Sequence, residues 1–164
     1  MMTPFTLAVC AEMIWQDRPI DWRCARLAEM GFEVGLWNWP DHDLSKLQRS
    51  GARFSIMNGY VTGRLADDDG ADDLLRSARE TAGVGKRLGV QRLNLHGTGL
   101  GDGGLPVVPS EVVTGSMWLK ARDTLSRIAE MAEEEGVVFT LENLNLPVDH
   151  PGTPFGRVED CLAL

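Results

Sequence analysis

The chain has 164 residues, 43% of them hydrophobic and 24% charged, which is the composition of one folded domain with a substantial core. There are 16 Lys and Arg against 24 Asp and Glu, so the net charge is -8 and the pI is near 4.8. Without a basic cluster, this acidity argues against a nucleic-acid partner and against docking on anionic membranes. No apolar run approaches the ~20 residues that span a bilayer. We therefore expect a single domain over residues 1–164.

The three cysteines point to a reducing compartment. Cys10, Cys24 and Cys161 are odd in number and unrelated in spacing, so they predict free thiols and neither a disulfide framework nor a zinc site. The N-terminus lacks the basic and apolar regions of a secretory signal. A cytoplasmic location follows as an expectation.

Five apolar segments typical of buried strands alternate with helical patterns along the chain. The strands are expected at residues 5–10, 32–37, 53–57, 90–95 and 137–141. Helices are expected over residues 22–30, 44–49 and 71–88, over a long stretch after residue 110, and from residue 157 onward. Asp21 and Ser110 are candidate N-caps. The acidic run at residues 67–69 is interpreted as a solvated loop.

This alternation predicts an α/β fold with a parallel sheet. Long loops follow the strands and short ones follow the helices, which favours a (β/α)8 TIM barrel with its site at the strand C-termini. A doubly wound open sheet is the alternative. No G-x-G-x-x-G follows the first strand, so no nucleotide cofactor is expected.

Polar side chains follow all five predicted strands. The fifth strand is continuously apolar, which predicts cover on both faces, and it runs directly into Glu142. Each side chain alone has a simpler explanation, such as a rim aromatic, a carbonyl-bonded histidine or a turn, and His42 and His150 alone suggest surface positions. Their joint placement at one sheet edge is what suggests a site. The groups are Glu12, Trp37 with Asn38, Asn58 with Tyr60, His96 with Thr98, and Glu142 with Asn143 and Asn145.

Four segments together resemble the hydroxypyruvate isomerase family of the xylose isomerase-like TIM-barrel superfamily. They are Leu-Glu-Asn-Leu-Asn at 141–145, Val-Asp-His-Pro-Gly at 148–152, Arg-Leu-Asn-Leu-His-Gly at 92–97 and Gly-Phe-Glu-Val-Gly-Leu-Trp at 31–37. The resemblance extends over essentially the whole chain, and the 141–145 motif is its most specific part.

The resemblance implies an isomerase that moves a carbonyl along a small hydroxy-keto acid or sugar, as between hydroxypyruvate and tartronate semialdehyde. Glu142 would be both the acid–base group and a ligand of a divalent metal, Mg or Mn, because a carboxylate can shuttle a proton and suits hard cations. His96, Asn58, Asn145, His150 and Trp37 would bind substrate.

A whole barrel of this type needs about 250 residues, so the sequence predicts only about five β/α units of one. By family analogy, further metal ligands and a second catalytic glutamate belong to later strands. A five-strand sheet exposes an edge, so we expect either self-association through that edge, giving a homo-oligomer, or an incomplete isomerase.

Three alternatives stay open at the level of sequence. A ketose 3-epimerase and a 2-oxo-tetronate isomerase use the same proton shuttle, and a non-catalytic chain would bind a partner or sugar at its open edge. A DNA-repair endonuclease on this barrel is disfavoured, because it needs a multi-zinc cluster and a basic groove, whereas the chain has three His.

Overall fold

The computed structural model describes residues 5–101 and 104–164 and confirms the α/β prediction. Its sheet has five parallel strands in the order β1-β2-β3-β4-β5. Because each strand lies beside the one before it in sequence, the doubly wound alternative, whose strand order reverses, is wrong. The strands are β1 (Ala8–Cys10), β2 (Glu33–Leu36), β3 (Phe54–Asn58), β4 (Arg92–Leu95) and β5 (Val138–Leu141).

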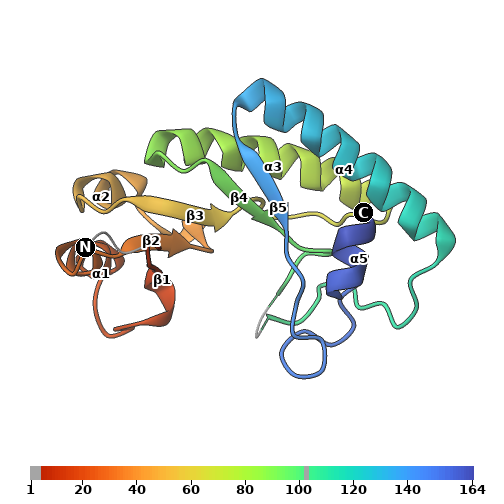
Figure 1. Ribbon diagram of the computed structural model, residues 1–164, viewed down its shortest axis with the longest axis horizontal. Coiled ribbons are helices and arrows are strands. Elements are labelled where there is room, and N and C mark those ends of the chain that lie inside the picture. The colour runs from red at the N-terminus through yellow and green to blue at the C-terminus, as the bar shows by residue number, and fades with distance from the viewer. Residues whose placement is uncertain (1–4, 102–103) are drawn as a thin grey trace.

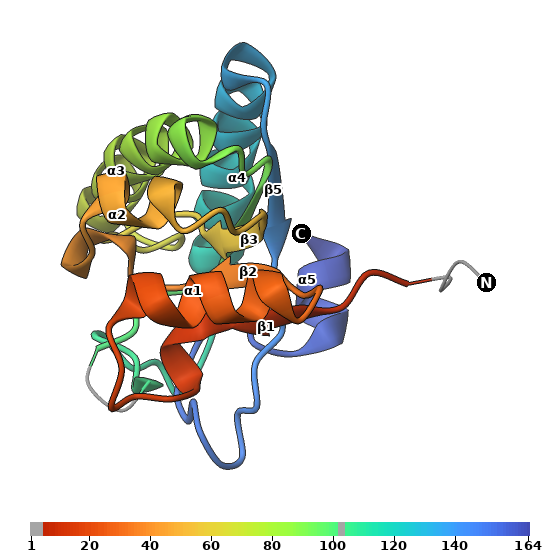
Figure 2. The same ribbon diagram turned by 90° about the vertical axis from the view of Figure 1, so that its left-hand side faces the viewer.

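Helices follow the strands, as predicted. The two longest, α3 and α4, pack against each other along one side of the sheet (Figure 1). Helix α1 lies beside the β1–β2 end of the sheet (Figure 2). The helices are α1 (Ile20–Glu29), α2 (Leu44–Arg49), α3 (Asp68–Leu88), α4 (Gly115–Glu135) and α5 (Val158–Ala163), with short 3-10 turns η1 (Ala11–Met13) and η2 (Trp39–Asp41).

Two predicted helix caps are wrong. Helix α1 begins at Ile20, before Asp21, with Pro19 at its N-cap and no side-chain cap hydrogen bond. Helix α4 begins at Gly115, because the Thr114 hydroxyl accepts the Met117 N–H at 3.3 Å. The Ser110 hydroxyl instead donates to the carbonyl of Val112.

The acidic run at residues 67–69 is also not the predicted loop. Asp67 is the N-cap of α3 and accepts the Gly70 N–H at 2.7 Å, and Asp68 and Asp69 form the first turn. Carboxylates at this end of a helix interact favourably with its dipole. The sequence signal was therefore a helix start.

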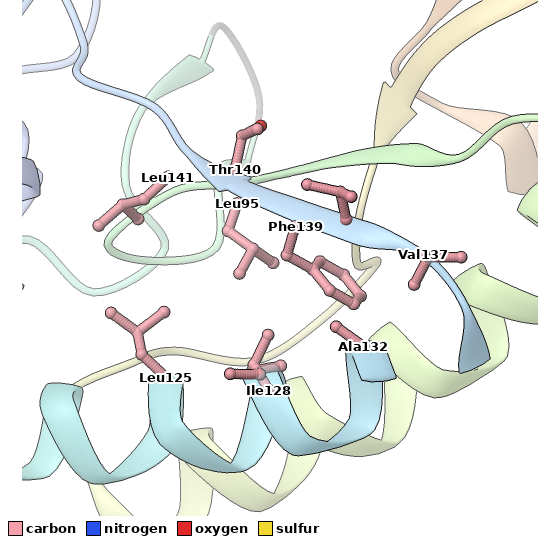
Figure 3. A pocket seen from close by; sticks show the side chains of 10 residues that line it. Leu95, Leu125, Ile128, Ala132, Val137, Phe139, Thr140 and Leu141 are labelled. Atoms are coloured by element: carbon pink, nitrogen blue, oxygen red, sulfur yellow. The ribbon is translucent and has the colours of Figure 1, made fainter. Parts of the chain in front are cut away.

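The prediction that the fifth strand is covered on both faces is wrong, because only the face that carries Phe139 and Leu141 packs against a helix, α4. Val138 is 56% exposed, and exposed and half-buried residues alternate along the strand. In Figure 3, Phe139 and Leu141 point toward α4, whereas Thr140 points away from it. An apolar groove of about 290 Å³ lies between β5 and α4, lined by residues such as Leu125, Ile128 and Phe139 (Figure 3).

Strand and helix side chains meet in two neighbouring apolar clusters. One joins β1, β2, β3 and α1 around Val34 and Leu27, and the other joins α3, α4 and the end of β4 around Leu74 and Leu95. The three cysteines are free thiols, as predicted. Within the part of the chain that the structure describes, no helix is both long and apolar enough to cross a membrane.

Candidate functional site

Polar side chains form two rows across the carboxyl end of the sheet. Asn58, Asn94 and Thr140 are register partners on β3, β4 and β5, so they share one face, which is the face opposite α4. Tyr60, His96 and Glu142 each lie two residues further on. His96 and Glu142 form a second row above Asn94 and Thr140, since side chains two apart in an extended chain point to the same side. Tyr60 follows a bend at Gly59 and packs in the buried cluster around Leu74 and Leu95, from which its hydroxyl reaches His96.

Glu142 is the centre of this arrangement. Its Oε2 lies 3.1 Å from His96 Nε2 and also accepts a hydrogen bond from Asn94 Nδ2. Thr140 Oγ1 donates to Asn94 Oδ1 at 2.9 Å, which turns the amide nitrogen of Asn94 toward Glu142. The Glu142 side chain is still 48% exposed. Two donors therefore hold one oxygen of a carboxylate that solvent can reach.

These contacts keep Glu142 ionised. The hydrogen bond from His96 lowers the pKa of Glu142 below its usual value, and burial opposes this shift. The hydrogen bond from Asn94 and the nearby charges of His96 and His150 lower the pKa further. At neutral pH the group is therefore a carboxylate, the form that a proton acceptor or a cation ligand requires.

Tyr60 closes the row on the side away from Glu142. Its hydroxyl donates to the Thr98 carbonyl at 2.6 Å and lies 3.1 Å from His96 Nδ1. Burial raises the pKa of this phenol, so it stays protonated. His96 thus lies between a buried hydroxyl and an exposed carboxylate.

Glu12, at the end of β1, makes a separate cluster. Its carboxylate accepts the backbone N–H groups of Trp37 at 2.6 Å and Asn38 at 2.9 Å, and it lies 2.8 Å from His42 Nε2. The Glu12 side chain is only 7% exposed and the His42 side chain 16%. His42, which the sequence suggested was a surface residue, is therefore half-buried, and Glu12 holds the loop after β2.

The other predicted substrate-binding residues lie around the two rows. Asn58 donates to the Tyr60 carbonyl at 3.1 Å, and its buried Oδ1 has no partner among the described residues. Asn145 donates to Asp149 at 2.9 Å, and His150 Nδ1 lies 2.6 Å from the Gly104 carbonyl, so both organise the loop after β5. Trp37 is 60% exposed at the end of β2.

Asn94 is the candidate site residue that the sequence did not point to. It lies inside a predicted strand, whereas the predicted site residues follow strand ends. The signal was present as a polar residue two positions before His96, repeated as Asn58 before Tyr60 and Thr140 before Glu142.

The described residues do not fit a divalent metal by themselves. Glu142 and His96 could supply two metal ligands, but they already hydrogen-bond to each other. No group of three His, Cys, Asp or Glu side chains that could hold a metal ion occurs in residues 5–101 and 104–164. A stable site for such a cation takes more protein ligands than these. We therefore derive no chemical step through a metal, and Mg or Mn stays a prediction.

Known proteins match this chain by structure. No protein-family model and no curated protein sequence matches it. An AP endonuclease, family 2, from Brucella melitensis matches with a TM-score of 0.71 and 18% identity, over 92% of this chain and 59% of its own. The 3-keto-D-glucoside 4-epimerase YcjR from E. coli matches with a TM-score of 0.61 and 17% identity, over 85% and 56%.

A third match is IolI, whose structure has a bound zinc atom, with a TM-score of 0.62 and 17% identity over 91% of this chain and 54% of its own. The five parallel strands and their helices correspond to about five β/α units of a TIM barrel. Other matches bear the names L-ribulose 3-epimerase, D-psicose 3-epimerase and xylose isomerase-like TIM barrel. This chain spans between about half and three fifths of the three proteins described first. At these identities the likeness shows the fold alone.

Proposed function

We propose that this chain carries an acid–base group of a small-sugar or hydroxy-keto acid isomerase, with Glu142 as that group. The observation that carries the proposal is the Glu142 carboxylate, ionised and accessible at the carboxyl end of β5, with His96 and Asn94 on one of its oxygens. TIM-barrel enzymes have their active sites at this carboxyl end of the strands. Several structural matches are named as sugar epimerases or isomerases, which supports the same class.

The geometry suggests which atom acts. Oε2 of Glu142 takes both side-chain donors, whereas Oε1 accepts no side-chain hydrogen bond from the described residues. Oε1 would remove a proton from the carbon beside the substrate carbonyl, leaving the electron pair in an enediolate. Returning the proton to the former carbonyl carbon, while the hydroxyl proton passes to the former carbonyl oxygen, gives an isomer. An epimer results when a second acid on the opposite face returns a proton to the same carbon.

Within this class we propose hydroxypyruvate–tartronate semialdehyde chemistry first, on the resemblance around residues 141–152. A ketose 3-epimerase or a 2-oxo-tetronate isomerase is the alternative, and the names of two matched epimerases favour the first of these. The shared proton transfer does not separate these reactions. Trp37, Asn58, Asn145 and His150 would shape the substrate pocket, and a non-catalytic role in sugar binding would need only that pocket.

Proton exchange tests the role of Glu142 directly. The chain would be incubated in D₂O with hydroxypyruvate, D-fructose or D-psicose, with and without Mg²⁺ or Mn²⁺, and loss of the C–H signal beside the carbonyl followed by ¹H NMR. Glu142→Gln keeps the shape but is a poor base, so exchange should fall about 10²- to 10⁴-fold.

Glu130→Gln is the matched control, because Glu130 is an exposed glutamate on α4, away from the polar rows, and its variant should exchange at the wild-type rate. Exchange by Glu142→Gln within a few-fold of wild type would exclude Glu142 as the base. No exchange by the wild-type chain on any substrate would favour the non-catalytic alternative.

A further inference from the structure

Tyr60 is the single tyrosine of the chain and contacts His96 on the side of the ring away from Glu142. It is 3% exposed, and its ring meets the imidazole edge-on, with centroids 5.8 Å apart and planes at 68°. It follows β3, two residues beyond Asn58, and its hydroxyl reaches both His96 and the backbone at Thr98. Such contacts can orient the ring beside Glu142.

The Tyr60 hydroxyl has one hydrogen and two neighbouring polar atoms, the Thr98 carbonyl oxygen and His96 Nδ1. The Thr98 carbonyl can only accept, and it lies 2.6 Å from the Tyr60 oxygen, so the hydrogen must lie between these two atoms. If it turned toward His96 instead, two oxygen atoms with only lone pairs would face each other at that distance. Tyr60 is therefore a donor to Thr98.

The contact with His96 then has only one possible direction. The Tyr60 oxygen is 3.1 Å from His96 Nδ1, and since its hydrogen is used, it must accept. Nδ1 accordingly carries a hydrogen. Nε2 lies 3.1 Å from Glu142 Oε2, and because a carboxylate oxygen can only accept, Nε2 carries a hydrogen as well, so His96 donates from both ring nitrogens.

We propose that Tyr60 is a positioning residue for the site, which holds His96 with its Nδ1–H toward the Tyr60 oxygen and its Nε2 toward Glu142. The proposal rests on the proposed function of Glu142 for its catalytic meaning. With His96 fixed, Oε2 of Glu142 stays occupied and Oε1 stays free for substrate. Without the hydroxyl, the Nδ1–H of His96 loses its only side-chain acceptor among the described residues, and the ring can lose that hydrogen or turn over.

The test is Tyr60→Phe, which removes the hydroxyl and keeps the buried ring. The three histidines would be labelled with ¹⁵N, and the His96 signals identified by their absence in His96→Gln. In the wild type, long-range ¹H–¹⁵N spectra should show the hydrogen on Nδ1 of His96. In Tyr60→Phe that Nδ1 signal should shift toward its unprotonated position.

Thr81→Val is the control, because it also removes a buried hydroxyl, one that accepts from the Trp39 ring at 3.2 Å and does not touch His96. It should leave the His96 signals unchanged. In the exchange assay, Tyr60→Phe should lower kcat about 10- to 100-fold, by analogy with the partners that orient metal-ligating histidines, with KM little changed. Thr81→Val should exchange at the wild-type rate.

Each result has a definite meaning. A wild-type His96 without hydrogen on Nδ1 overturns the proposal, and it does so even when Tyr60→Phe fails to fold. Unchanged His96 signals in a folded Tyr60→Phe also overturn it. A hydrogen on Nδ1 that is lost in Tyr60→Phe supports it, and if the wild type then shows no exchange, the proposed function fails while the role of Tyr60 stands.

Discussion

Two glutamates follow strands at the carboxyl end of the sheet, and their surroundings differ. The carboxylate of Glu12 is buried and is used by two backbone N–H groups and one histidine. The Glu142 carboxylate is half exposed and keeps one oxygen free of side-chain donors from the described part of the chain. Glu12 is therefore suited to hold a loop, whereas Glu142 is suited to act on a ligand.

Glu12→Gln should destabilise the protein. An amide has one oxygen for three donors, and its NH₂ group would face N–H groups, so at least one N–H donor loses its partner. The expected cost is about 1–3 kcal/mol in the free energy of unfolding, measured by urea denaturation. Because Trp37 lies in the loop that Glu12 holds, tryptophan fluorescence of the folded state should change too.

His42→Gln is the matched control, since it removes the histidine partner of Glu12 and leaves both backbone contacts. Its loss of stability should be smaller than that of Glu12→Gln. Equal stability of Glu12→Gln and wild type would show that the loop after β2 does not depend on this carboxylate.

At the scale of elements, the sequence predicted the strands and their order well because apolar segments bounded by glycine are a local signal. Each of the five strands lies inside its expected segment, except that β3 extends one residue beyond it, to Asn58. The side-chain network was harder to predict, because the contact of Glu142 with Asn94 joins residues 48 positions apart and depends on register. The partners of Tyr60 likewise depend on how the chain turns after β3.

The burial of the β5 faces and the N-cap residues of the helices were harder to predict for the same reason. Whether β5 is covered on one face or two depends on which elements pack on those faces, and an apolar run alone does not encode this. Asp21 and Ser110 have the right residue type for a cap, but Pro19 and Thr114 lie where the helices start. At Asp67 the local signal was sufficient, and it was interpreted as a loop because three acidic residues stood together.

The N-cap of α3 gives a prediction at this scale. Asp67 accepts the Gly70 N–H and pairs with Arg64 through both carboxylate oxygens, at 2.7 and 2.8 Å. Asp67→Ala should lower the free energy of unfolding at neutral pH by about 1 kcal/mol, the usual cost of losing a cap. Asp67→Asn keeps an acceptor for Gly70 and should lose less.

The effect should depend on pH in a defined direction. Hydrogen bonds from Arg64 lower the pKa of Asp67 in the folded state, against burial. The stabilisation is therefore fully present above the pKa of the unfolded state and disappears as pH falls through the lower folded value. Urea denaturation over a pH series should show wild type and Asp67→Ala converging in acid. A gap that stays constant down to low pH would contradict this account.

At the scale of the whole molecule, the sheet has two edges. Strands β1 and β5 each have a strand on one side only within the described residues. Apolar side chains are exposed at both edges, with Leu7 at 64% just before β1 and Val138 at 56% on β5. Parallel sheets are normally closed or covered, because a free edge offers unpaired N–H and C=O groups to another chain.

We therefore expect the chain to self-associate through the β5 edge, with a second copy pairing there. Sedimentation velocity over a wide range of concentrations should show a larger species growing with concentration. Val138→Lys should weaken this association, since a charged side chain on an edge strand opposes pairing. Val148→Lys is the control, because Val148 is 72% exposed in the loop after β5 and should leave the association unchanged. A monomer at every concentration would show that the exposed edge is tolerated in isolation.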